Sequence, residues 1–308
     1  MRRMDKIETL AWLDGEILPV QEIRISPLAH SLHYGTGVFE GIRCYEQEAG
    51  GGGVFRLREH MERLIVSARI LGYEVPHSVD QLMEAAVQTL RENGMSSAYI
   101  RPLVWLDEGG MGVAGGNNPV RTMIAVWHWG AYLGEDGLRN GIRTQLSSYE
   151  RATGNASASR AKITGQYVTS FMAKRQAIAL GLDEGLLVDR DGYLAEGTGE
   201  NLFIARGGLI ATAPDASPIL HGITRGTVLT LLADLGFEVR YERFTRTDLY
   251  AADEAFLTGT AAEVTPIREI DGRALRESPG PVTRALQETF QSVVRGQGER
   301  AAEWITPV

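Results

Sequence analysis

The sequence predicts two α+β domains and argues against a single doubly wound parallel sheet. Strand-like and helical segments alternate irregularly, two-residue turn pairs join several strands, and neither an internal repeat nor a β-α-β series is visible. The 308 residues are long enough for two domains with separate cores. Because residues 130–141 hold four glycines and little periodicity, we expect a small domain over 1–130, an interdomain loop over 131–140 and a larger domain over 141–308.

Short strands and hairpins are predicted at the beginning of the chain. Leu10–Leu13 and Glu16–Pro19 flank Asp14-Gly15, a pair that favours a tight hairpin turn. An extended segment over 37–45 precedes a run of glycines at 50–53. We interpret this run as a flexible hairpin tip, because glycine loses more backbone entropy on ordering than other residues.

Helical periodicity begins after residue 56. Apolar residues recur at the spacing of one helix face, at Leu57, Met61, Leu64, Ile65, Ala68 and Leu71. A second helix is predicted over 78–93, with Ser78 as its N-cap and Gly94 as its stop. Paired strands over 98–106 and 122–129 enclose a loop rich in glycine and asparagine.

The second half mixes strands with three expected helices. These helices span approximately 167–180, 224–235 and 282–295. Asp191-Gly192 marks a further hairpin turn between two of the strands.

Composition favours small-molecule chemistry in the cytoplasm. The net charge is -8, whereas nucleic-acid binding would call for a basic stripe. The sequence has no apolar run long enough to cross a bilayer, and its charged start lacks the apolar core of a secretory signal. Cys44 is the only cysteine, which fits a reducing compartment. The six histidines are scattered without an HExxH pair, so no metal site is expected.

Lysine is rare enough to narrow a search for a Schiff-base amine. Only three of the 31 basic residues are lysines: Lys6, Lys162 and Lys174. Such a lysine must be partly desolvated and held on a defined backbone. Lys6 sits in the terminus, and Lys174 is predicted mid-helix beside Arg175 on a solvated face. Lys162 therefore remains, on the condition that the chemistry needs such a lysine.

The other parts of a pyridoxal 5′-phosphate site are also present in the sequence. Residues 222–226 open a predicted helix and 258–262 form a second small-residue turn, so both offer backbone N–H groups to a phosphate, with Arg58 as a candidate cation. Glu196 and Glu200, in a glycine-flanked bend, could pair with a pyridine nitrogen. Taken singly, these features are more simply a helix cap, a turn and a surface arginine. The bend does not match the dinucleotide fingerprint GxGxxG.

Several motifs in a fixed order carry a family resemblance. They are LHYGTGVFEGIR at 32–43, YIRP at 99–102, GMGV at 110–113, WGAYLG at 129–134, EGTGENLF at 196–203, GITR at 222–225 and GTAAE at 259–263. In this series the chain resembles bacterial branched-chain amino acid aminotransferases, which are fold-type IV pyridoxal-phosphate enzymes. The resemblance covers nearly the whole sequence. It implies a two-domain α+β fold with mainly antiparallel sheets and packed helices.

The resemblance also implies a role for individual residues. Lys162 would form the Schiff base with the cofactor and carry the proton between the substrate α-carbon and the cofactor. Glu196 would pair with the pyridine nitrogen and Tyr167 with the ring hydroxyl. The phosphate would be held by Arg58, Ile223, Thr224 and Thr260.

For the substrate, the resemblance implies one pocket with two kinds of partner. Tyr99 and the backbone of Thr260 and Ala261 would hold the α-carboxylate, and Arg101 the second carboxylate of glutamate. The side-chain pocket would be lined by Tyr34, Phe39, Val113, Trp129 and Tyr132. Phe39 and Trp129 could instead be ordinary core aromatics. An arginine at the rim can serve a carboxylate without placing an unpaired charge among apolar groups.

The implied reaction transfers the amino group of L-leucine, L-isoleucine or L-valine to 2-oxoglutarate by a ping-pong mechanism, as in the biosynthesis of these amino acids. A D-amino acid or (R)-amine transaminase on the same fold, an aminodeoxychorismate lyase and a non-catalytic cofactor-binding protein are the alternatives. Family members generally form at least dimers, and Val113 would be a candidate for a cross-subunit contribution. Two residues near the phosphate segment depart from the pattern: His221 replaces a usual proline and Gly226 a common acid.

Overall fold

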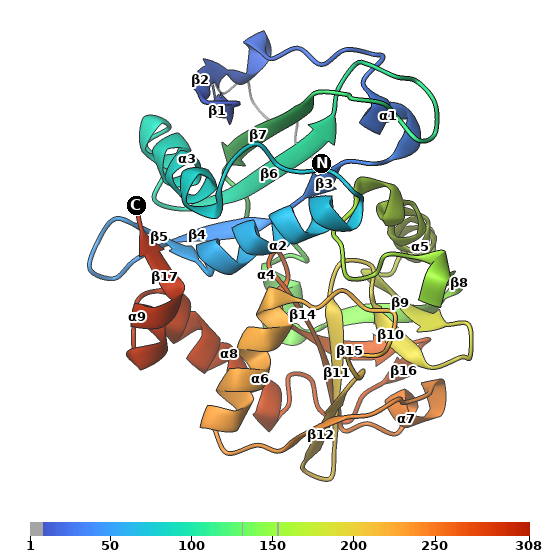
Figure 1. Cartoon of the computed structure of the whole chain (residues 1–308). Coiled ribbons are helices and arrows are strands. Elements are labelled where there is room, and N and C mark those ends of the chain that lie inside the picture. Colours follow the sequence, from blue (N-terminus) through green and yellow to red (C-terminus); the bar gives the residue numbers. More distant parts are fainter. Residues whose placement is uncertain (1–8, 131, 153) are drawn as a thin grey trace. The chain divides into compact units, whose positions relative to one another are not determined.

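The computed structural model describes residues 9–130, 132–152 and 154–308, which cluster into two compact units (Figure 1). The first, called the N-unit, comprises Met1–Trp129, Ala161–Gly165 and Val294–Val308. The second, the C-unit, comprises Gly130–Arg160 and Gln166–Val293. The chain first passes from the N-unit to the C-unit after Trp129, and two later segments return to the N-unit, which local sequence patterns could not indicate.

The expected loop over 131–140 is not wholly a loop. It contains α4 (Glu135–Asn140), which begins after Gly134 and ends before Gly141. Both glycines have positive φ, 81° and 82°, so they bound the helix at conformations that other residues rarely adopt. The glycines that suggested a linker therefore include the two ends of a short helix.

An antiparallel sheet forms the centre of the N-unit. Its strands are β1 (Leu10–Leu13), β2 (Glu16–Pro19), β3 (Val38–Phe39), β4 (Ile42–Glu46), β5 (Gly52–Phe55), β6 (Ala98–Leu106), β7 (Val120–Trp127) and β17 (Ile305–Pro307). Their order is β17-β5-β4-β6-β7-β1-β2, with β3 beside β6. Asp14 and Gly15 both have positive φ at the β1–β2 turn, so the predicted hairpin is confirmed.

The glycine run at 50–53 is only partly a hairpin tip. Gly50 and Gly51 turn the chain, whereas Gly52 and Gly53 belong to β5 and are buried. A Cβ on Gly53 would lie 2.6 Å from Cγ2 of Ile305, on the neighbouring strand β17. The interpretation of the whole run as flexible is thus wrong, because Gly52 and Gly53 lie in β5, which packs closely against β17.

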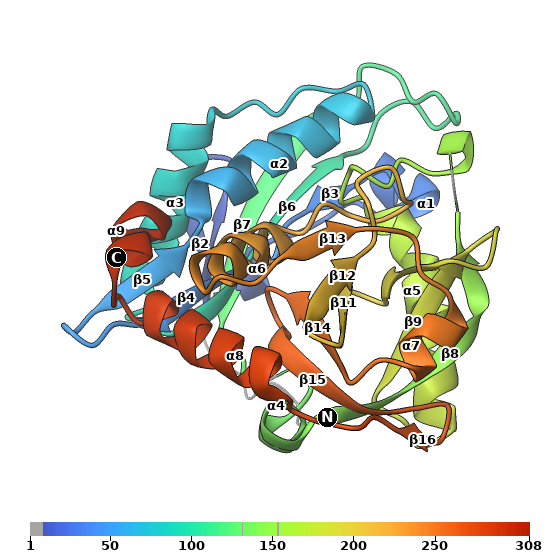
Figure 2. The ribbon, with the colours of Figure 1, turned by 90° about the horizontal axis from the view of Figure 1, so that it is seen from below.

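Helices α2 and α3 pack on the N-unit sheet (Figure 2). The helices of this unit are α1 (His30–Tyr34), α2 (Leu57–Ile70), α3 (Val79–Glu92) and α9 (Glu299–Trp304), with a short 3-10 turn at Val20–Glu22. Leu57, Met61, Leu64 and Ala68 of α2 are buried as the periodicity predicts. Ser78 caps α3 in a reciprocal capping box with Gln81, so this helix start is confirmed.

The C-unit contains a mixed sheet. Its strands are β8 (Ile142–Arg151), β9 (Glu184–Asp189), β10 (Leu194–Gly197), β11 (Asn201–Arg206), β12 (Leu209–Thr212), β13 (Val239–Tyr241), β14 (Glu254–Gly259), β15 (Glu263–Ile270) and β16 (Arg273–Ala274). Their order is β10-β9-β8-β15-β14-β11-β12-β13, with β16 on β15. The pairs β8–β9, β8–β15 and β12–β13 are parallel and the rest antiparallel.

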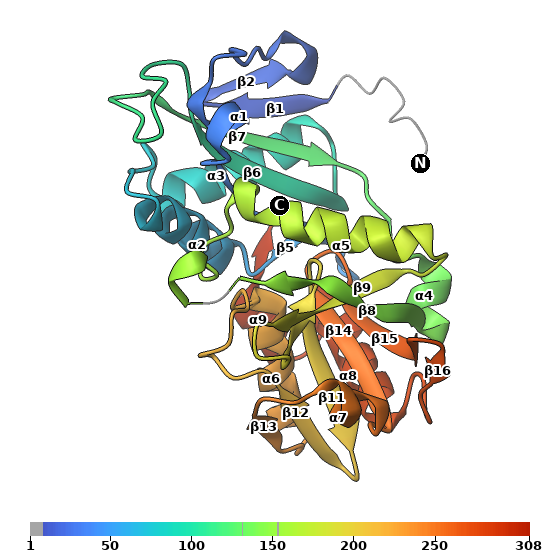
Figure 3. The same cartoon turned by 90° about the vertical axis from the view of Figure 1, so that its right-hand side faces the viewer.

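Parallel pairs in this sheet form β-α-β units, although no β-α-β series is visible in the sequence. The helices of the C-unit besides α4 are α5 (Tyr167–Ala179), α6 (Ile223–Asp234), α7 (Arg246–Tyr250) and α8 (Pro281–Val294), with 3-10 turns at Gly154–Ala156 and Thr164–Gln166 nearby. The helices α5, α6 and α8 are confirmed. Figure 3 shows α5 along β8 and β9, so β8-α5-β9 is a β-α-β unit, as is β12-α6-β13. The first was not visible in the sequence because the segment 152–166 separates its strand from its helix.

Stacked aromatics and branched aliphatics fill the core of the C-unit sheet. The rings of Phe203 and Phe256, on neighbouring strands, lie 5.1 Å apart and nearly parallel.

Within the described residues, the longest apolar helices fall short of what a membrane crossing requires.

A buried ionic group lies between α5 and the start of β9. Nζ of Lys174 lies 2.6 Å from Oε2 of Glu184, a fully buried side chain that also accepts a hydrogen bond from Thr198. The expectation that Lys174 lies on a solvated face is therefore wrong, because α5 turns this side chain toward the sheet. Burial, followed by the charge of Glu184, raises the pKa of Glu200 to about 8.

Replacement of Glu200 by glutamine should remove part of the pH dependence of stability. In the folded protein this carboxyl keeps its proton up to about pH 8, whereas in the unfolded chain it ionises near its ordinary pKa of 4.5. The free energy of unfolding should therefore fall as the pH rises through this range, and Glu200→Gln should fall less. Urea unfolding of both proteins across the range measures this difference. Parallel pH profiles would contradict the prediction.

Candidate active site

Lys162 is held in the N-unit by hydrogen bonds on both sides of its Cα. Its backbone N–H donates to Oγ of Ser67 at 3.0 Å, and its carbonyl accepts from the N–H of Phe39 at 3.1 Å. Its half-buried side chain places Nζ 5.0 Å from the centroid of the Phe39 ring. Lys6 lies outside the described residues, and Lys174 is paired with Glu184. Lys162 thus has the fixed backbone and partial shielding that a reactive amine requires.

Close backbone contact explains one glycine of the first motif. Gly35 has a φ of 65°, and a Cβ there would lie 2.7 Å from Cα of Gly165. Gly165 donates its N–H to the carbonyl of Gly35, while Thr164 donates to Gly37. A larger side chain at Gly35 would therefore push away the segment that carries Lys162.

Arg101 lies among aromatic rings in the same unit. Its guanidinium carbon is 4.9 Å from the ring centroid of Phe39, 5.3 Å from that of Tyr99 and 5.7 Å from that of Trp127. Its Nη2 donates to the Tyr99 hydroxyl at 3.2 Å. Its Nε is shielded from solvent without a hydrogen-bond partner, and no carboxylate of the described residues pairs with it. A guanidinium in this state is suited to bind the carboxylate of a ligand.

The aromatic residues around Arg101 include one that the sequence reasoning missed. The Trp129 ring lies 4.5 Å from that of Tyr99, so both predicted residues belong to this group. Trp127 was not predicted, although it lies directly opposite Tyr99 in the β6–β7 pairing. The predicted pairing of these two strands was a signal that could have indicated it.

Two of the three arginines of helix α2, Arg58 and Arg63, lie in opposite environments. The Arg58 side chain is 53% exposed and pairs with Asp80, away from the Lys162 contacts. The Arg63 side chain is 14% exposed and holds Glu40 through Nε at 2.6 Å and Nη2 at 2.9 Å. The surroundings of Arg58 do not favour its predicted role as a phosphate ligand.

Glu40 is the buried centre of this part of the N-unit. Besides Arg63, it accepts from Nδ1 of His60 at 2.7 Å. Burial alone raises the pKa of a carboxyl, but the charge of Arg63 and the hydrogen bonds from His60 and Arg63 hold the pKa of Glu40 well below its usual range. Sequence reasoning missed all three residues, although Glu40 lies in the first motif and His60 and Arg63 share one face of α2.

Two predicted pocket residues lie at the loop over 109–119. The Tyr34 hydroxyl donates to the carbonyl of Met111 at 2.9 Å, and the ring is 40% exposed. Val113 is 83% exposed. Neither makes one of the aromatic contacts described for Arg101, so the structure does not bring them into that group.

Glu196 is the most constrained predicted residue of the C-unit. Only 3% exposed at the end of β10, it pairs through Oε1 with Nη2 of Arg151 at 2.5 Å. Its Oε2 accepts from Nδ2 of Asn201 at 3.2 Å and from the N–H of Leu220 at 3.1 Å. These donors favour a charged carboxylate, which can accept a hydrogen bond from a protonated ring nitrogen. Sequence reasoning gave no role to Arg151.

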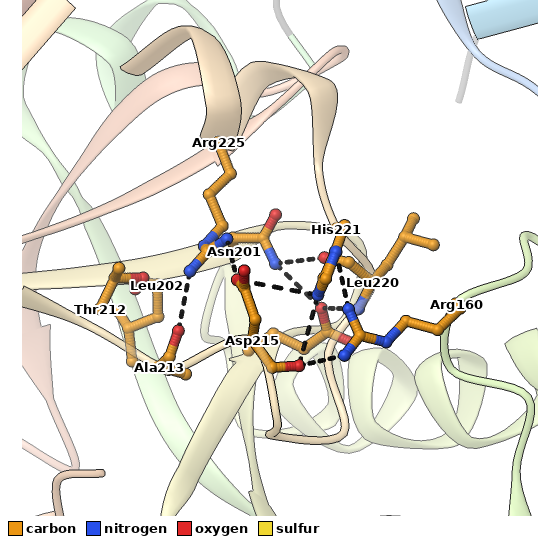
Figure 4. A network of polar contacts seen from close by, with 10 residues as sticks. Arg160, Asn201, Leu202, Thr212, Ala213, Asp215, Leu220, His221 and Arg225 are labelled. Atoms are coloured by element: carbon orange, nitrogen blue, oxygen red, sulfur yellow. Dashed lines mark hydrogen bonds and ion pairs between the residues drawn. The ribbon is translucent and has the colours of Figure 1, made fainter. Parts of the chain in front are cut away.

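Helix α6 begins three residues after Leu220, whose N–H binds this carboxylate and whose carbonyl accepts from Asn201 (Figure 4). Its N-cap, Gly222, makes no side-chain cap, so no cap side chain competes for the first N–H groups, which suit an anion such as a phosphate. A Cβ on Gly222 would lie 2.1 Å from Oδ1 of Asn201, which explains the glycine. Predicted residues Ile223 and Thr224 form the first turn, with Thr224 buried.

The second predicted turn connects β14 and β15. It contains Thr260 and Ala261, both half-buried. Thr258, which precedes the turn, pairs across the sheet with Asn201, and its buried Oγ1 has no hydrogen-bond partner among the described residues. Asn201 therefore links both predicted turns, and the hydroxyl of Thr258 is available to an anion there.

A polar network fixes the loop ahead of α6 (Figure 4). Arg225 donates to Oδ1 of Asp215 at 3.0 Å and to the carbonyl of Ala213 at 2.9 Å. Arg160 donates to Nδ1 of His221 at 2.6 Å. The histidine that replaces the usual proline thus takes part in side-chain contacts that hold this loop.

The two predicted tyrosines of the C-unit differ in position. Tyr167 is half-buried and begins α5. Tyr132 is 36% exposed, and its ring centroid lies 5.0 Å from Nζ of Lys174. Tyr132 is therefore found beside the ion pair of α5 and β9.

Comparisons with known proteins agree with this arrangement. A family model described as amino-transferase class IV matches residues 37–270. A branched-chain-amino-acid aminotransferase of Pseudomonas aeruginosa is 47% identical over 298 residues, which cover 96% of each chain. The solved structure of the Escherichia coli branched-chain amino acid aminotransferase has a TM-score of 0.94 at 42% identity, over 97% of this chain and 99% of that one.

A second solved structure is that of the T.th. branched-chain amino acid aminotransferase with pyridoxamine 5′-phosphate. It has a TM-score of 0.93 at 46% identity and covers 98% of this chain and 99% of its own. These structures confirm the predicted two-part α+β fold. Since the family model matches well over half of the sequence, the chain belongs to the amino-transferase class IV family.

Proposed function

We propose that this protein is a pyridoxal-phosphate-dependent aminotransferase that moves the amino group of L-leucine, L-isoleucine or L-valine to 2-oxoglutarate by a ping-pong mechanism. The observation that carries the proposal is the grouping of Lys162, Phe39 and Arg101 in the N-unit. It combines an amine, an apolar ring and a guanidinium whose Nε has no hydrogen-bond partner among the described residues. The names of the relatives, 44–47% identical over nearly their whole length, support it.

The donors of the C-unit fit the cofactor. Pyridoxal 5′-phosphate supplies a protonated ring that accepts the electron pair of the broken C–H bond. Glu196, kept charged by Arg151, would receive the ring N–H, and Tyr167 would contact the ring hydroxyl. The first N–H groups of α6, at Ile223 and Thr224, and the turn at Thr260 would hold the phosphate, joined by the hydroxyl of Thr258. The relative that was solved with pyridoxamine 5′-phosphate supports this assignment.

From the N-unit we assign Arg63, and not Arg58, to the phosphate. Arg63 lies on the buried face of α2, on the same side as Ser67, which binds the Lys162 backbone. Lys162 would hold the cofactor and afterwards take the proton from the substrate α-carbon on Nζ. Its fixed backbone supports this role because proton transfer requires a defined distance.

Two kinds of amino donor can use one pocket. The branched side chain would lie against Phe39 and Trp129, and the second carboxylate of glutamate would bind Arg101. Tyr99 and the backbone of Thr260 and Ala261 would bind the α-carboxylate. The remaining predicted residues Tyr34, Val113 and Tyr132 would complete the pocket. The exposure of Val113 supports a contribution across a homo-oligomer. The single cysteine fits a location in the cytoplasm.

Lys162→Ala should abolish the half-reaction while leaving the cofactor bound noncovalently. The protein should lose the absorption band near about 410 nm that a lysine-bound cofactor gives, because the amine is gone. Spectra before and after leucine and then 2-oxoglutarate measure both properties. The wild-type band should disappear with leucine and return with 2-oxoglutarate. A colourless wild-type protein or normal turnover by the variant would refute the assignment.

Arg101→Ala should discriminate between the two kinds of donor. Loss of a charged hydrogen bond should lower kcat/KM for glutamate by about tenfold or more, and affect leucine much less. Arg121→Ala is a matched control on the neighbouring strand, where the arginine pairs with Asp14 and Asp107. Equal losses with both donors would exclude the proposed role. A panel with D-alanine and (R)-1-phenylethylamine tests the alternative transaminase activities.

Arg58 and Arg63 of α2 give a separate test of the phosphate assignment. Arg63→Gln should weaken cofactor binding by about tenfold, because it removes a charged donor. Arg58→Gln should leave it unchanged, since that side chain is exposed and bound to Asp80. Equilibrium dialysis of cofactor measures both. A larger effect at Arg58 would restore the sequence-based assignment.

A further inference from the structure

Beside its buried apolar face, α2 carries a row of shielded polar side chains that the periodicity did not indicate. His60, Arg63 and Ser67 follow one another at helical spacing, with side chains that are 2%, 14% and 0% exposed. Buried polar groups cost free energy unless they are hydrogen-bonded. Each of the three therefore requires a partner, and their partners lie on Lys162 and Glu40.

The hydroxyl of Ser67 accepts a backbone hydrogen bond that a neighbouring strand would otherwise accept. β3 meets the Lys162 segment only at an isolated bridge between Val38 and Ile163. The N–H of Lys162 donates to the Ser67 hydroxyl at 3.0 Å, while its carbonyl accepts from Phe39. A single hydroxyl from α2 thus fixes the peptide group that precedes the Cα of Lys162.

Glu40 anchors the other side of this arrangement. Its backbone N–H donates to the carbonyl of Pro102 at 2.9 Å, and its side chain accepts from His60 and Arg63. Burial lowers the pKa of His60, and the charges of Arg63 and Lys162 add to this effect against that of Glu40, so the ring is neutral and donates through Nδ1. Phe39, directly before Glu40, is consequently held where its N–H meets Lys162.

We propose that Ser67 and Glu40 are positioning residues that set the place of Lys162 Nζ for proton transfer. The inference rests on the proposed function. In that step the proton leaves the substrate α-carbon for Nζ, and the electron pair of the C–H bond passes to the cofactor. A lysine side chain has four rotatable bonds, so the position of Nζ depends on a fixed Cα. A shift of about 1 Å can slow a reaction by up to a hundredfold.

Ser67→Ala removes the hydroxyl that accepts the Lys162 N–H and nothing else. In single-turnover experiments with L-leucine, the rate should fall by about tenfold with little change in the apparent binding constant. The isotope effect with α-deuterated leucine should increase, because proton transfer becomes slower than the other steps. The visible circular dichroism per bound cofactor should also change. Glu40→Gln should alter the same three quantities in the same direction.

Thr89→Val is the matched control. Thr89 lies on α3, is fully buried and donates its hydroxyl to the carbonyl of Ala85 at 2.6 Å. Its loss should reduce stability, as for Ser67, without changing the rate, the isotope effect or the dichroism. Wild-type values in Ser67→Ala, or equal changes in Thr89→Val, would overturn the inference.

A failure of the proposed function would give a different result. In that case the wild-type protein itself would not react with leucine. The visible dichroism needs no amino donor, so it would still compare Ser67→Ala with Thr89→Val. Indistinguishable dichroism in the two variants would then overturn the inference independently of the substrate.

Discussion

The N-unit site depends on the burial of one charge, the carboxylate of Glu40. A charge removed from water is tolerated only when paired and hydrogen-bonded, and Arg63 and His60 satisfy both conditions. These contacts join α2 to the chain around Phe39. The N–H of Phe39 donates to the carbonyl of Lys162, and the ring of Phe39 lies beside the guanidinium of Arg101. One desolvated carboxylate thereby organises groups that lie far apart in the sequence.

The C-unit uses the same physical device for a different purpose. Glu196 is buried and paired with Arg151, as Glu40 is with Arg63. Arg101 differs from both arginines, because no described carboxylate satisfies it. A protein that leaves a shielded guanidinium in this state pays in stability for a ready binding site. Pairing with a buried carboxylate therefore does not by itself exclude a ligand role, which is proposed for Arg63, whereas a shielded guanidinium without such a partner, as in Arg101, indicates one.

Much of the fold could be predicted because it follows from local patterns. The Asp14-Gly15 turn, the Ser78 cap and the apolar face of α2 each depend on neighbouring residues. The returning segments, the parallel strands and the true partner of Lys174 depend on contacts between distant residues, which periodicity does not encode. At the site, elimination and motifs indicated Lys162 and Glu196. The supporting residues Ser67, Glu40 and Arg151 could not be recognised, because a serine or an arginine reveals its partner only after folding.

The return of β17 to β5 has a consequence for biosynthesis of the chain. The last residues complete the N-unit sheet, and the N–H of Val308 donates to the carbonyl of Gly52 (Figure 1). A nascent chain on the ribosome therefore carries β5 as an open sheet edge until Ile305–Pro307 have been synthesised and can pair with it. Such edges invite pairing with other chains. Fragments that lack Ile305–Pro307 would prolong that exposure and favour aggregation during expression.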